Sequence, residues 1–194
     1  MILATRNLHK VRELDEILPA AGLRPLPDEV ESPPETGVTF EENALIKARS
    51  AREATGEAVI ADDSGLEVDA LGGRPGVYSA RYAGEGATDG ENLGKVLSDL
   101  AAANGGDQSG SARYVCVIAL VDDSGEHLFR GTCEGRIVRQ PRGDGGFGYD
   151  PAFVPDATGP DDQRTMAELS PEEKNAISHR GAAAQQLADH LADV

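Results

Sequence analysis

Residues 58–65 read AVIADDSG, a short unbroken apolar run followed at once by two aspartates, a serine and a glycine. An apolar run of this length that is bounded by turn-forming residues is typical of an interior strand. We therefore expect a buried strand that starts near residue 58 and ends where Asp62 and Asp63 begin. Paired carboxylates at the end of such a strand can hold a magnesium ion that bridges to phosphate groups.

The same tetrapeptide, Asp-Asp-Ser-Gly, occurs again at residues 122–125. There it separates two strand-like segments, residues 112–121 and 127–138, which together predict a β-hairpin. Aspartate, serine and glycine are common turn residues, so a hairpin turn explains the second copy fully. The tetrapeptide by itself is therefore only weak evidence for a metal site.

Start and stop signals divide the remaining chain into a short first strand, residues 1–4, and several helices. A helical stripe of apolar residues predicts a first helix from Leu8 to before Pro19. Capping residues predict helices from Thr39 to about Thr55, from Thr88 to Asn104, and from Ser170 towards Leu191. Residues 23–34 are rich in proline and predict irregular structure. This mixture predicts an α/β fold with one curved mixed sheet, formed as a single domain over residues 1–194.

The composition excludes several classes of protein. A net charge of −16 argues against polymeric nucleic acid as a partner, because that binding needs a basic face. No apolar run approaches the roughly 18 residues of a membrane span, and the N-terminus has no signal segment, so we expect a cytoplasmic protein without a membrane partner. Cys116 and Cys133 would lie nearly opposite each other in the hairpin, but without a secretory context we expect thiols.

Only four of the eighteen basic residues are lysines, so each lysine needs its own explanation. Lys10 lies at the start of the first helix beside Thr5 and Asn7, where helix amides and a cation could together hold a phosphate. Lys47 lies in the middle of the second helix, one turn after Asn43. The alternative for both lysines is a solvated position on a helix surface.

A glycine-rich loop, residues 143–150, reads GDGGFGYD. It fits the pattern GxGxxG but opens no helix of a βαβ unit, and no Lys-Ser/Thr follows, so dinucleotide and P-loop interpretations are rejected. Phe147, Tyr149 and Asp150 instead suit stacking on a base and accepting hydrogen bonds from its edge, although a surface turn remains an alternative. Lys174 and His179 cannot share one helix face, so we expect a break near the His-Arg-Gly step.

Taken together, six segments in this order resemble the inosine triphosphate pyrophosphatase family, also described as non-standard purine NTP pyrophosphatases. The segments are residues 4–10 (ATRNLHK), 36–44 (TGVTFEENA) with Lys47, 60–65 (IADDSG), 76–82 (GVYSARY), 145–151 (GGFGYDP) and 173–181 (EKNAISHRG).

The resemblance implies an elongated α/β fold with a central mixed sheet, two lobes flanking a substrate cleft, and a homodimer. It implies hydrolysis of purine nucleoside triphosphates (ITP, dITP, XTP) between the α and β phosphates, with Mg²⁺ as cofactor. Asp63 is the expected catalytic residue, and Asp63, Glu35 and Asp62 are the expected metal ligands. The expected substrate-binding residues are Thr5, Arg6, Asn7, Leu8, His9, Lys10, Lys47, Ser64, Phe147, Gly148, Tyr149, Asp150, Lys174, His179 and Arg180.

The first motif departs from the family pattern, which usually reads Thr-Gly-Asn with a further small residue before its lysine. Here Arg6 and His9 occupy those places. Both side chains are bulky, so we expect a different backbone approach to phosphate, while an added positive charge suits a triphosphate. Two alternatives remain open: a Maf-type pyrophosphatase acting on pyrimidine or modified nucleotides, and a non-catalytic nucleotide-binding module.

Overall fold

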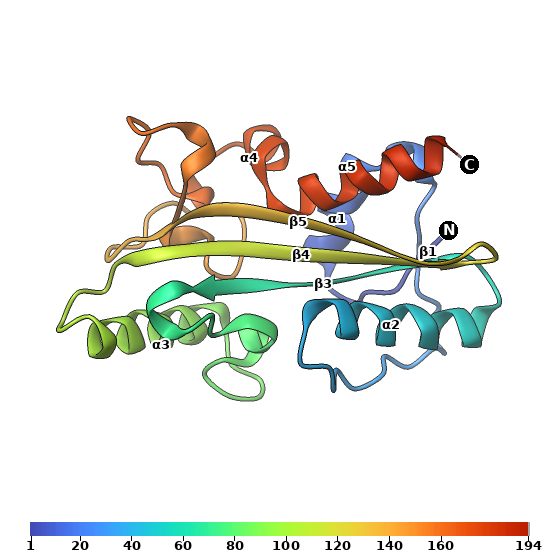
Figure 1. Cartoon of the computed structure of the whole chain (residues 1–194), viewed down its shortest axis with the longest axis horizontal. Helices are drawn as coiled ribbons and strands as arrows, with labels where there is room; N and C mark the ends of the chain where they lie inside the picture. Colours follow the sequence, from blue (N-terminus) through green and yellow to red (C-terminus); the bar gives the residue numbers. More distant parts are fainter. Residues whose placement is uncertain (194) are drawn as a thin grey trace. The chain divides into compact units, whose positions relative to one another are not determined.

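The structure is a computed structural model that describes residues 1–193. Its strands are β1 (Ile2–Leu3), β2 (Arg24–Pro25), β3 (Val59–Val68), β4 (Gly110–Asp122), β5 (Gly125–Ile137) and β6 (Phe153–Pro155), and its α-helices are α1 (Leu8–Ile17), α2 (Phe40–Thr55), α3 (Asp89–Ala103), α4 (Pro171–Ile177) and α5 (His179–Ala192) (Figure 1). The strands form one sheet in the order β2-β1-β3-β4-β5-β6. Parallel pairing of β1 with β2 and β3, and antiparallel pairing of β5 with β6, confirm the predicted mixed sheet.

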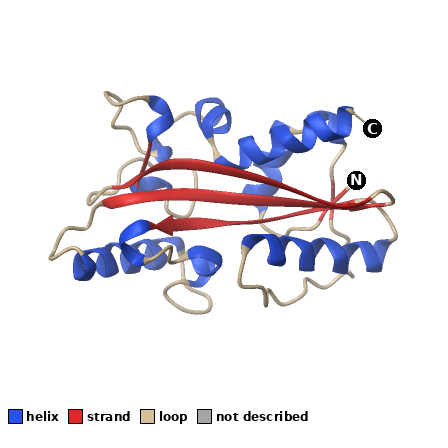
Figure 2. Cartoon of the chain, viewed as in Figure 1, coloured by secondary structure: helices blue, strands red, loops and turns tan. Residues whose placement is uncertain are grey.

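The chain divides into two compact units. The first unit comprises residues 1–63, 116–131 and the chain from 179 onward, and the second comprises residues 64–115 and 132–178. In the first unit, α2 covers one face of the strands, and α1 and α5 cover the other (Figure 2). The chain passes between units within β3, β4 and β5, so neither unit is a continuous segment; the single domain expected over residues 1–194 stays a prediction.

Each unit has its own hydrophobic core. In the first unit the core contains Ile60 of β3 and Cys116 of β4, packed against side chains of α1 and α5. In the second unit Leu66 of β3 and Cys133 of β5 pack with side chains of α3 and β6. Both cysteines are buried and free, and burial raises the pKa of each thiol to about 12. Within the described residues, no helix is long and apolar enough to cross a membrane.

The strand β3 does not end at Asp62, as the sequence predicted, but continues to Val68. Two features explain the error. Leu66 and Val68 are fully buried and extend the apolar pattern beyond the tetrapeptide. Asp62 and Asp63 both have cationic partners, so a strand can carry two buried carboxylates without leaving either charge uncompensated. The two aspartates therefore lie within the strand rather than at its end.

The predicted helix starts are confirmed. Asn7 caps α1, and the capping boxes of α3 and α4 form both of their reciprocal hydrogen bonds. The box of α2 is half formed, because Thr39 accepts from the backbone N–H of Glu42 while the Glu42 carboxylate accepts from the backbone N–H of Val38. At the other end, Gly56 closes α2 in a left-handed conformation, with φ of 70°.

Two short strands were not predicted. Within the segment expected to be irregular, β2 pairs with β1, and the backbone N–H of Arg24 donates to the Met1 carbonyl at 2.9 Å. The strand β6 pairs with β5 beside Gly135, where a Cβ would lie 2.4 Å from the Val154 carbonyl oxygen. Both strands lie in proline-containing segments and are only two or three residues long, so they carry no alternating pattern, and their pairing reveals them.

The second Asp-Asp-Ser-Gly copy is the predicted turn between β4 and β5. The Asp122 carboxylate accepts from the backbone N–H groups of Ser124, at 2.7 Å, and Gly125, at 3.2 Å. The expected helix break is also present, one residue before His179, where Ser178 has an extended backbone between α4 and α5. The two copies of the tetrapeptide thus have different structures, a continuous strand in one case and a turn in the other.

Candidate functional site

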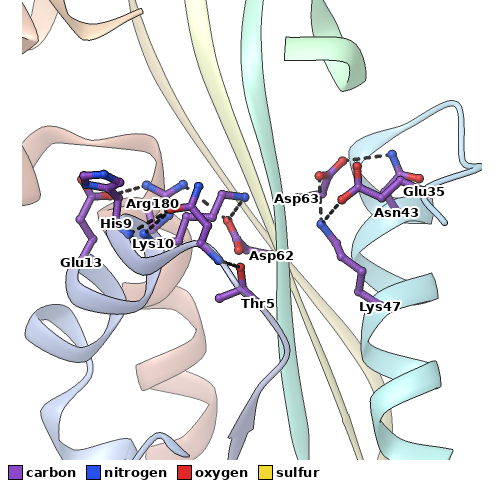
Figure 3. A network of polar contacts seen from close by, with 11 residues as sticks. Thr5, His9, Lys10, Glu13, Glu35, Asn43, Lys47, Asp62, Asp63 and Arg180 are labelled. Atoms are coloured by element: carbon purple, nitrogen blue, oxygen red, sulfur yellow. Dashed lines mark hydrogen bonds and ion pairs between the residues drawn. The ribbon is translucent and has the colours of Figure 1, made fainter. Parts of the chain in front are cut away.

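In the first unit, Asp63 lies in a cluster of polar side chains that we call the Asp63 cluster. Its members are Asp63, Lys47, Glu35 and Asn43 (Figure 3). The ammonium of Lys47 lies 3.1 Å from Asp63 Oδ1 and 2.9 Å from Glu35 Oε1. Asn43 donates from Nδ2 to Asp63 Oδ2 at 3.2 Å. The two carboxylates therefore converge on one cation.

Helix α2 and the loop before it build this cluster. Asn43 and Lys47 are four residues apart, so both side chains leave the same face of the helix towards β3. Asn43 also accepts at Oδ1 from the backbone N–H of Gly37, at 2.8 Å. A Cβ at Gly37 would lie 2.7 Å from that same oxygen, so glycine permits the close approach. Asn43 thus holds both Asp63 and the loop that carries Glu35.

The electrostatics of the cluster favour a charged lysine beside a basic carboxylate. Burial raises the pKa of Asp63, and the Lys47 ammonium offsets only part of that effect. Burial alone would lower the pKa of Lys47, but Asp63, Asp62 and Glu35 outweigh it, and the pKa is raised. At neutral pH, Lys47 therefore keeps its positive charge, while Asp63 binds a proton more readily than an exposed aspartate does.

Asp62 points away from this cluster and belongs to a separate network (Figure 3). Successive residues of a strand point to opposite faces of the sheet, and because β3 continues through both aspartates their side chains diverge. Asp62 Oδ2 lies 2.8 Å from Lys10 Nζ and 3.5 Å from Arg180 Nη2, and Arg180 Nη1 also contacts Glu13. Burial would raise the pKa of Asp62, but Lys10 and Arg180 outweigh it and hold the pKa well below the usual range.

The N-terminal motif shapes the start of α1. Thr5 Oγ1 accepts from the backbone N–H of Asn7, and Asn7 Oδ1 accepts from the backbone N–H groups of His9, at 3.0 Å, and Lys10, at 3.3 Å. His9 and Leu8 are exposed, with Leu8 at 68%. The side chains of Thr5 and Asn7 thus set the conformation of the segment that was expected to hold phosphate.

Arg6, one of the two departures from the family pattern, is bound by the segment that follows β2. Its guanidinium donates to the carboxylate of Asp28, at 3.1 Å, and to the carbonyl oxygens of Pro27, at 3.0 Å, and Val30, at 2.9 Å. These contacts connect the first motif to a neighbouring loop. The Arg6 guanidinium, which was expected to face a triphosphate, is bound to that loop instead.

The donors present suit a divalent cation at the Asp63 cluster. Asp63 and Glu35 offer hard carboxylate oxygens, and both already face one positive charge, the Lys47 ammonium. Over residues 1–193, no group of three or more His, Cys, Asp or Glu side chains could hold a metal ion. Mg²⁺ is commonly held by one or two carboxylates, with water and substrate phosphate oxygens completing its coordination. The residues therefore fit a metal shared with a phosphate substrate, and Asp62 does not face that position.

In the second unit, the glycine-rich loop contributes to a different buried cluster, the Asp150 cluster, formed by Asp150, Lys174, Tyr114 and Phe147. Asp150 Oδ2 accepts from Lys174 Nζ at 2.8 Å and from the backbone N–H of Phe147 at 2.9 Å. Asp150 Oδ1 accepts from the hydroxyl of Tyr114 at 3.0 Å. The Lys174 ammonium lies 4.9 Å from the centre of the Phe147 ring. A cation and an aromatic surface are thus held side by side.

Tyr114 was missed by the sequence analysis. Burial and the Asp150 carboxylate raise the pKa of its phenol well above the usual value, so it remains a hydrogen-bond donor. Its one signal in the sequence was its place in the apolar first strand of the hairpin, where a buried tyrosine hydroxyl needs a polar partner. That signal does not identify the partner, which lies 36 residues further along the chain.

Other residues of the loop have structural contacts. Tyr149 is 4% exposed, and its hydroxyl donates to the Ser79 carbonyl at 2.7 Å, so the ring belongs to the core of the second unit. The backbone N–H of Gly148 donates to Asp89 at 2.7 Å. A Cβ at Gly146 would lie 2.0 Å from Asp150 Oδ2, which explains why a glycine stands there.

The remaining expected site residues lie on β3 and α5. Ser64 follows Asp63 in β3 and is half-buried. His179 is buried at the start of α5, and a Cβ at Gly131 of β5 would lie 2.1 Å from its carbonyl oxygen. Arg180 is fully buried, and its guanidinium contacts the carboxylates of Asp62 and Glu13.

Comparison with known proteins gives consistent results over nearly the whole chain. The model of the Ham1 family matches residues 1–190. A protein of Mycolicibacterium paratuberculosis named dITP/XTP pyrophosphatase is 51% identical, with 98% of this chain and 95% of the relative covered. A protein of the same name from Coxiella burnetii is 48% identical, with 100% of this chain and 96% of the relative covered.

Solved structures agree with the sequence matches. A HAM1 protein from Coxiella burnetii has a TM-score of 0.88 and 47% identity, with 100% of this chain and 98% of that chain covered. The Ham1 protein of Staphylococcus aureus has a TM-score of 0.86 and 40% identity, with 99% and 97% covered.

Proposed function

Since this chain belongs to the Ham1 family, we propose that it hydrolyses non-standard purine nucleoside triphosphates, namely ITP, dITP and XTP. The products are the nucleoside monophosphate and pyrophosphate. Relatives with about half of their residues identical carry the name dITP/XTP pyrophosphatase. The observation that carries the proposal is the Asp63 cluster, in which two carboxylates contact a charged lysine and an asparagine donates to one of them.

The Asp63 cluster performs the phosphate chemistry. Asp63 accepts, or orients, the proton of a water molecule whose oxygen bonds to the α-phosphorus, while the bond from that phosphorus to the bridging oxygen breaks and pyrophosphate leaves. The raised pKa of Asp63 suits it to this role, because a carboxylate with a higher pKa is a better base. Lys47 and Lys10 bind phosphate oxygens, so positioning and charge neutralisation account for most of the catalysis.

Asp63 and Glu35 are the residues that would hold Mg²⁺. When bound, the ion neutralises phosphate charge and polarises the phosphorus–oxygen bonds. We assign Asp62 a different role, as the anion that binds Lys10, because its carboxylate lies on the other face of β3. Asn43 keeps Asp63 and the Glu35 loop in place through its two hydrogen bonds.

The Asp150 cluster recognises the base. Lys174 is a donor to the 6-oxo group of hypoxanthine or xanthine, Asp150 fixes the ammonium, and Phe147 supplies the stacking surface. Adenine places an amino donor where hypoxanthine places the oxygen, so donor would meet donor and ATP would be rejected. A homodimer and a cytoplasmic location, both expected from the sequence, stay predictions.

A substrate panel tests this function. We expect pyrophosphate release with Mg²⁺ from ITP, dITP and XTP at kcat/KM values at least about 100-fold above ATP, the range that unpaired buried donors produce. Equal values for ITP and ATP would contradict the base assignment. Preference for a pyrimidine or modified triphosphate would support the Maf-type alternative, and binding of ITP without product would support a non-catalytic module.

The variant Asp63→Asn tests the catalytic assignment on the same panel. It removes the proton acceptor and one metal ligand while keeping the shape of the side chain. We expect kcat to fall by at least about 100-fold, the usual contribution of a general base, with little change in melting temperature. Near-normal turnover would move the catalytic role to another residue.

A further inference from the structure

Phe147, the proposed stacking surface for the base, lies between two glycines of the second unit. Gly146 and Gly148 both have left-handed backbone conformations, with φ of 69° and 64°. Glycine has the widest choice of backbone conformations, so a segment of this composition does not hold a single conformation by itself. Contacts from other segments must therefore keep the Phe147 ring beside the Lys174 ammonium, which lies 4.9 Å from the ring centre.

Two contacts of this kind directly follow Phe147 in the sequence. The backbone N–H of Gly148 donates to Asp89 Oδ2 at 2.7 Å. The hydroxyl of the next residue, Tyr149, donates to the Ser79 carbonyl at 2.7 Å. Burial raises the pKa of Tyr149 above its usual value, so the hydroxyl stays protonated and remains a donor. The glycine-rich loop is thus attached to two other segments of the second unit.

Asp89 is the first residue of α3, and its side chain is not needed to cap that helix. Thr88 and Glu91 already form both hydrogen bonds of the capping box. Asp89 is exposed, and its carboxylate accepts from the backbone of the glycine-rich loop. A hydrogen bond to an ionised acceptor is roughly twice as strong as one between neutral groups. The bond to Gly148 is therefore a strong external contact for the backbone beside Phe147.

We propose that Asp89 is a positioning residue for recognition of the base: its carboxylate fixes the backbone of Gly148 and thereby the ring of Phe147. The inference rests on the proposed function, in which Phe147 and Lys174 contact the base. Asp89 acts through the loop and is assigned no contact with the substrate.

Two substitutions separate the hydrogen bond of Asp89 from its charge. An acidic residue in the first turn of a helix also stabilises the helix through the helix dipole, and this effect depends on charge. Asp89→Asn and Asp89→Ala both remove the charge. Asparagine keeps an acceptor oxygen for the Gly148 N–H, whereas alanine has none. A purely structural role of the charge would therefore make the two variants alike.

One assay measures the base and phosphate ends of the substrate separately. Formation of IMP from ITP with Mg²⁺ gives KM, and competition by inorganic tripolyphosphate, which has no base, gives an inhibition constant. For Asp89→Ala we expect KM to rise about tenfold, the effect of losing one charge-assisted hydrogen bond. For Asp89→Asn we expect a rise of about threefold, because a neutral bond keeps about half of the strength. The inhibition constant should stay within about twofold in both variants.

Three results would overturn the inference. One is an unchanged KM for ITP in Asp89→Ala. Another is an equal rise in both variants, because charge alone would then explain it. The third is a parallel rise of KM and of the tripolyphosphate constant, because the substitution would then affect more than the loop. Thermal melting of each variant confirms that the measured protein is folded at the assay temperature.

Lys174→Met distinguishes failure of the inference from failure of the proposed function. It should raise the KM of ITP and leave the tripolyphosphate constant unchanged, because Lys174 is assigned to the base. If KM does not change in Lys174→Met, the assignment of the base to the second unit is wrong, and the inference fails with it. If Lys174→Met raises KM and Asp89→Ala does not, the inference alone fails.

Discussion

Substitution of Asn43 tests whether a buried residue supports catalysis in addition to stability. The side chain is fully buried, donates to Asp63 at 3.2 Å and accepts from the Gly37 N–H at 2.8 Å. The variant Asn43→Ala removes both bonds and leaves a small cavity. A hydrogen bond to a charged group contributes roughly 1.5–3 kcal/mol and one between neutral groups about 1 kcal/mol, so we expect the free energy of unfolding to fall by about 2.5–4 kcal/mol.

Asn92 is the matched control. It is also buried, accepts from the Ala83 N–H at 2.8 Å and donates to the Ala80 carbonyl at 3.2 Å, but it contacts no carboxylate. Asn92→Ala removes two hydrogen bonds between neutral groups, so we expect the free energy of unfolding to fall by about 2 kcal/mol.

Urea denaturation gives the stabilities, and kcat for ITP with Mg²⁺ gives the activities. We expect kcat to fall at least about tenfold for Asn43→Ala, because Asp63 and the Glu35 loop lose their common anchor, and to stay within about twofold for Asn92→Ala. Equal activity of the two variants, at similar stabilities, would refute the positioning role of Asn43.

Three further predictions concern stability and reactivity. Gly131→Ala should cost about 1–3 kcal/mol in thermal unfolding, because the new Cβ would lie 2.1 Å from a carbonyl oxygen of α5, whereas Gly90→Ala meets open space in α3 and should be neutral or stabilising. Cys116 and Cys133, with pKa values of about 12, should resist iodoacetamide at pH 8 until the chain unfolds; rapid alkylation of the native protein would contradict their burial. Because the pKa of Asp62 is lowered in the folded state, the ionised carboxylate stabilises the fold above about pH 4, and this stabilisation is lost as the pH falls further. The free energy of unfolding should therefore fall less steeply with acid in Asp62→Asn than in the native protein.

Local signals in the sequence predicted the helices well. The helix starts at Thr39, Thr88 and Ser170 were predicted from capping residues, and capping acts within one turn, so the structure agrees with the prediction. The first helix was predicted from its apolar stripe, and the structure adds Asn7 as its cap. The hairpin turn at residues 122–125 was predictable for the same reason.

Features that depend on distant partners were not predictable in this way. The continuation of β3 beyond Asp63 depends on cations from α1, α2 and α5, whose approach no local pattern encodes. Because the strand continues, the side chains of Asp62 and Asp63 lie on opposite faces of the sheet. The prediction of one metal site formed by both carboxylates did not include this divergence. Tyr114 was missed likewise, since its partner Asp150 is recognisable only after the fold brings them together.

The central claim is that water attacks the α-phosphorus of a non-standard purine triphosphate. Phosphorus NMR of ITP incubated with the native protein and Mg²⁺ tests it most directly. We expect IMP and pyrophosphate as the first products, in equal amounts, with neither formed by Asp63→Asn on the same time scale. Release of orthophosphate with IDP would contradict it, because the cleaved bond would then lie between the β and γ phosphates.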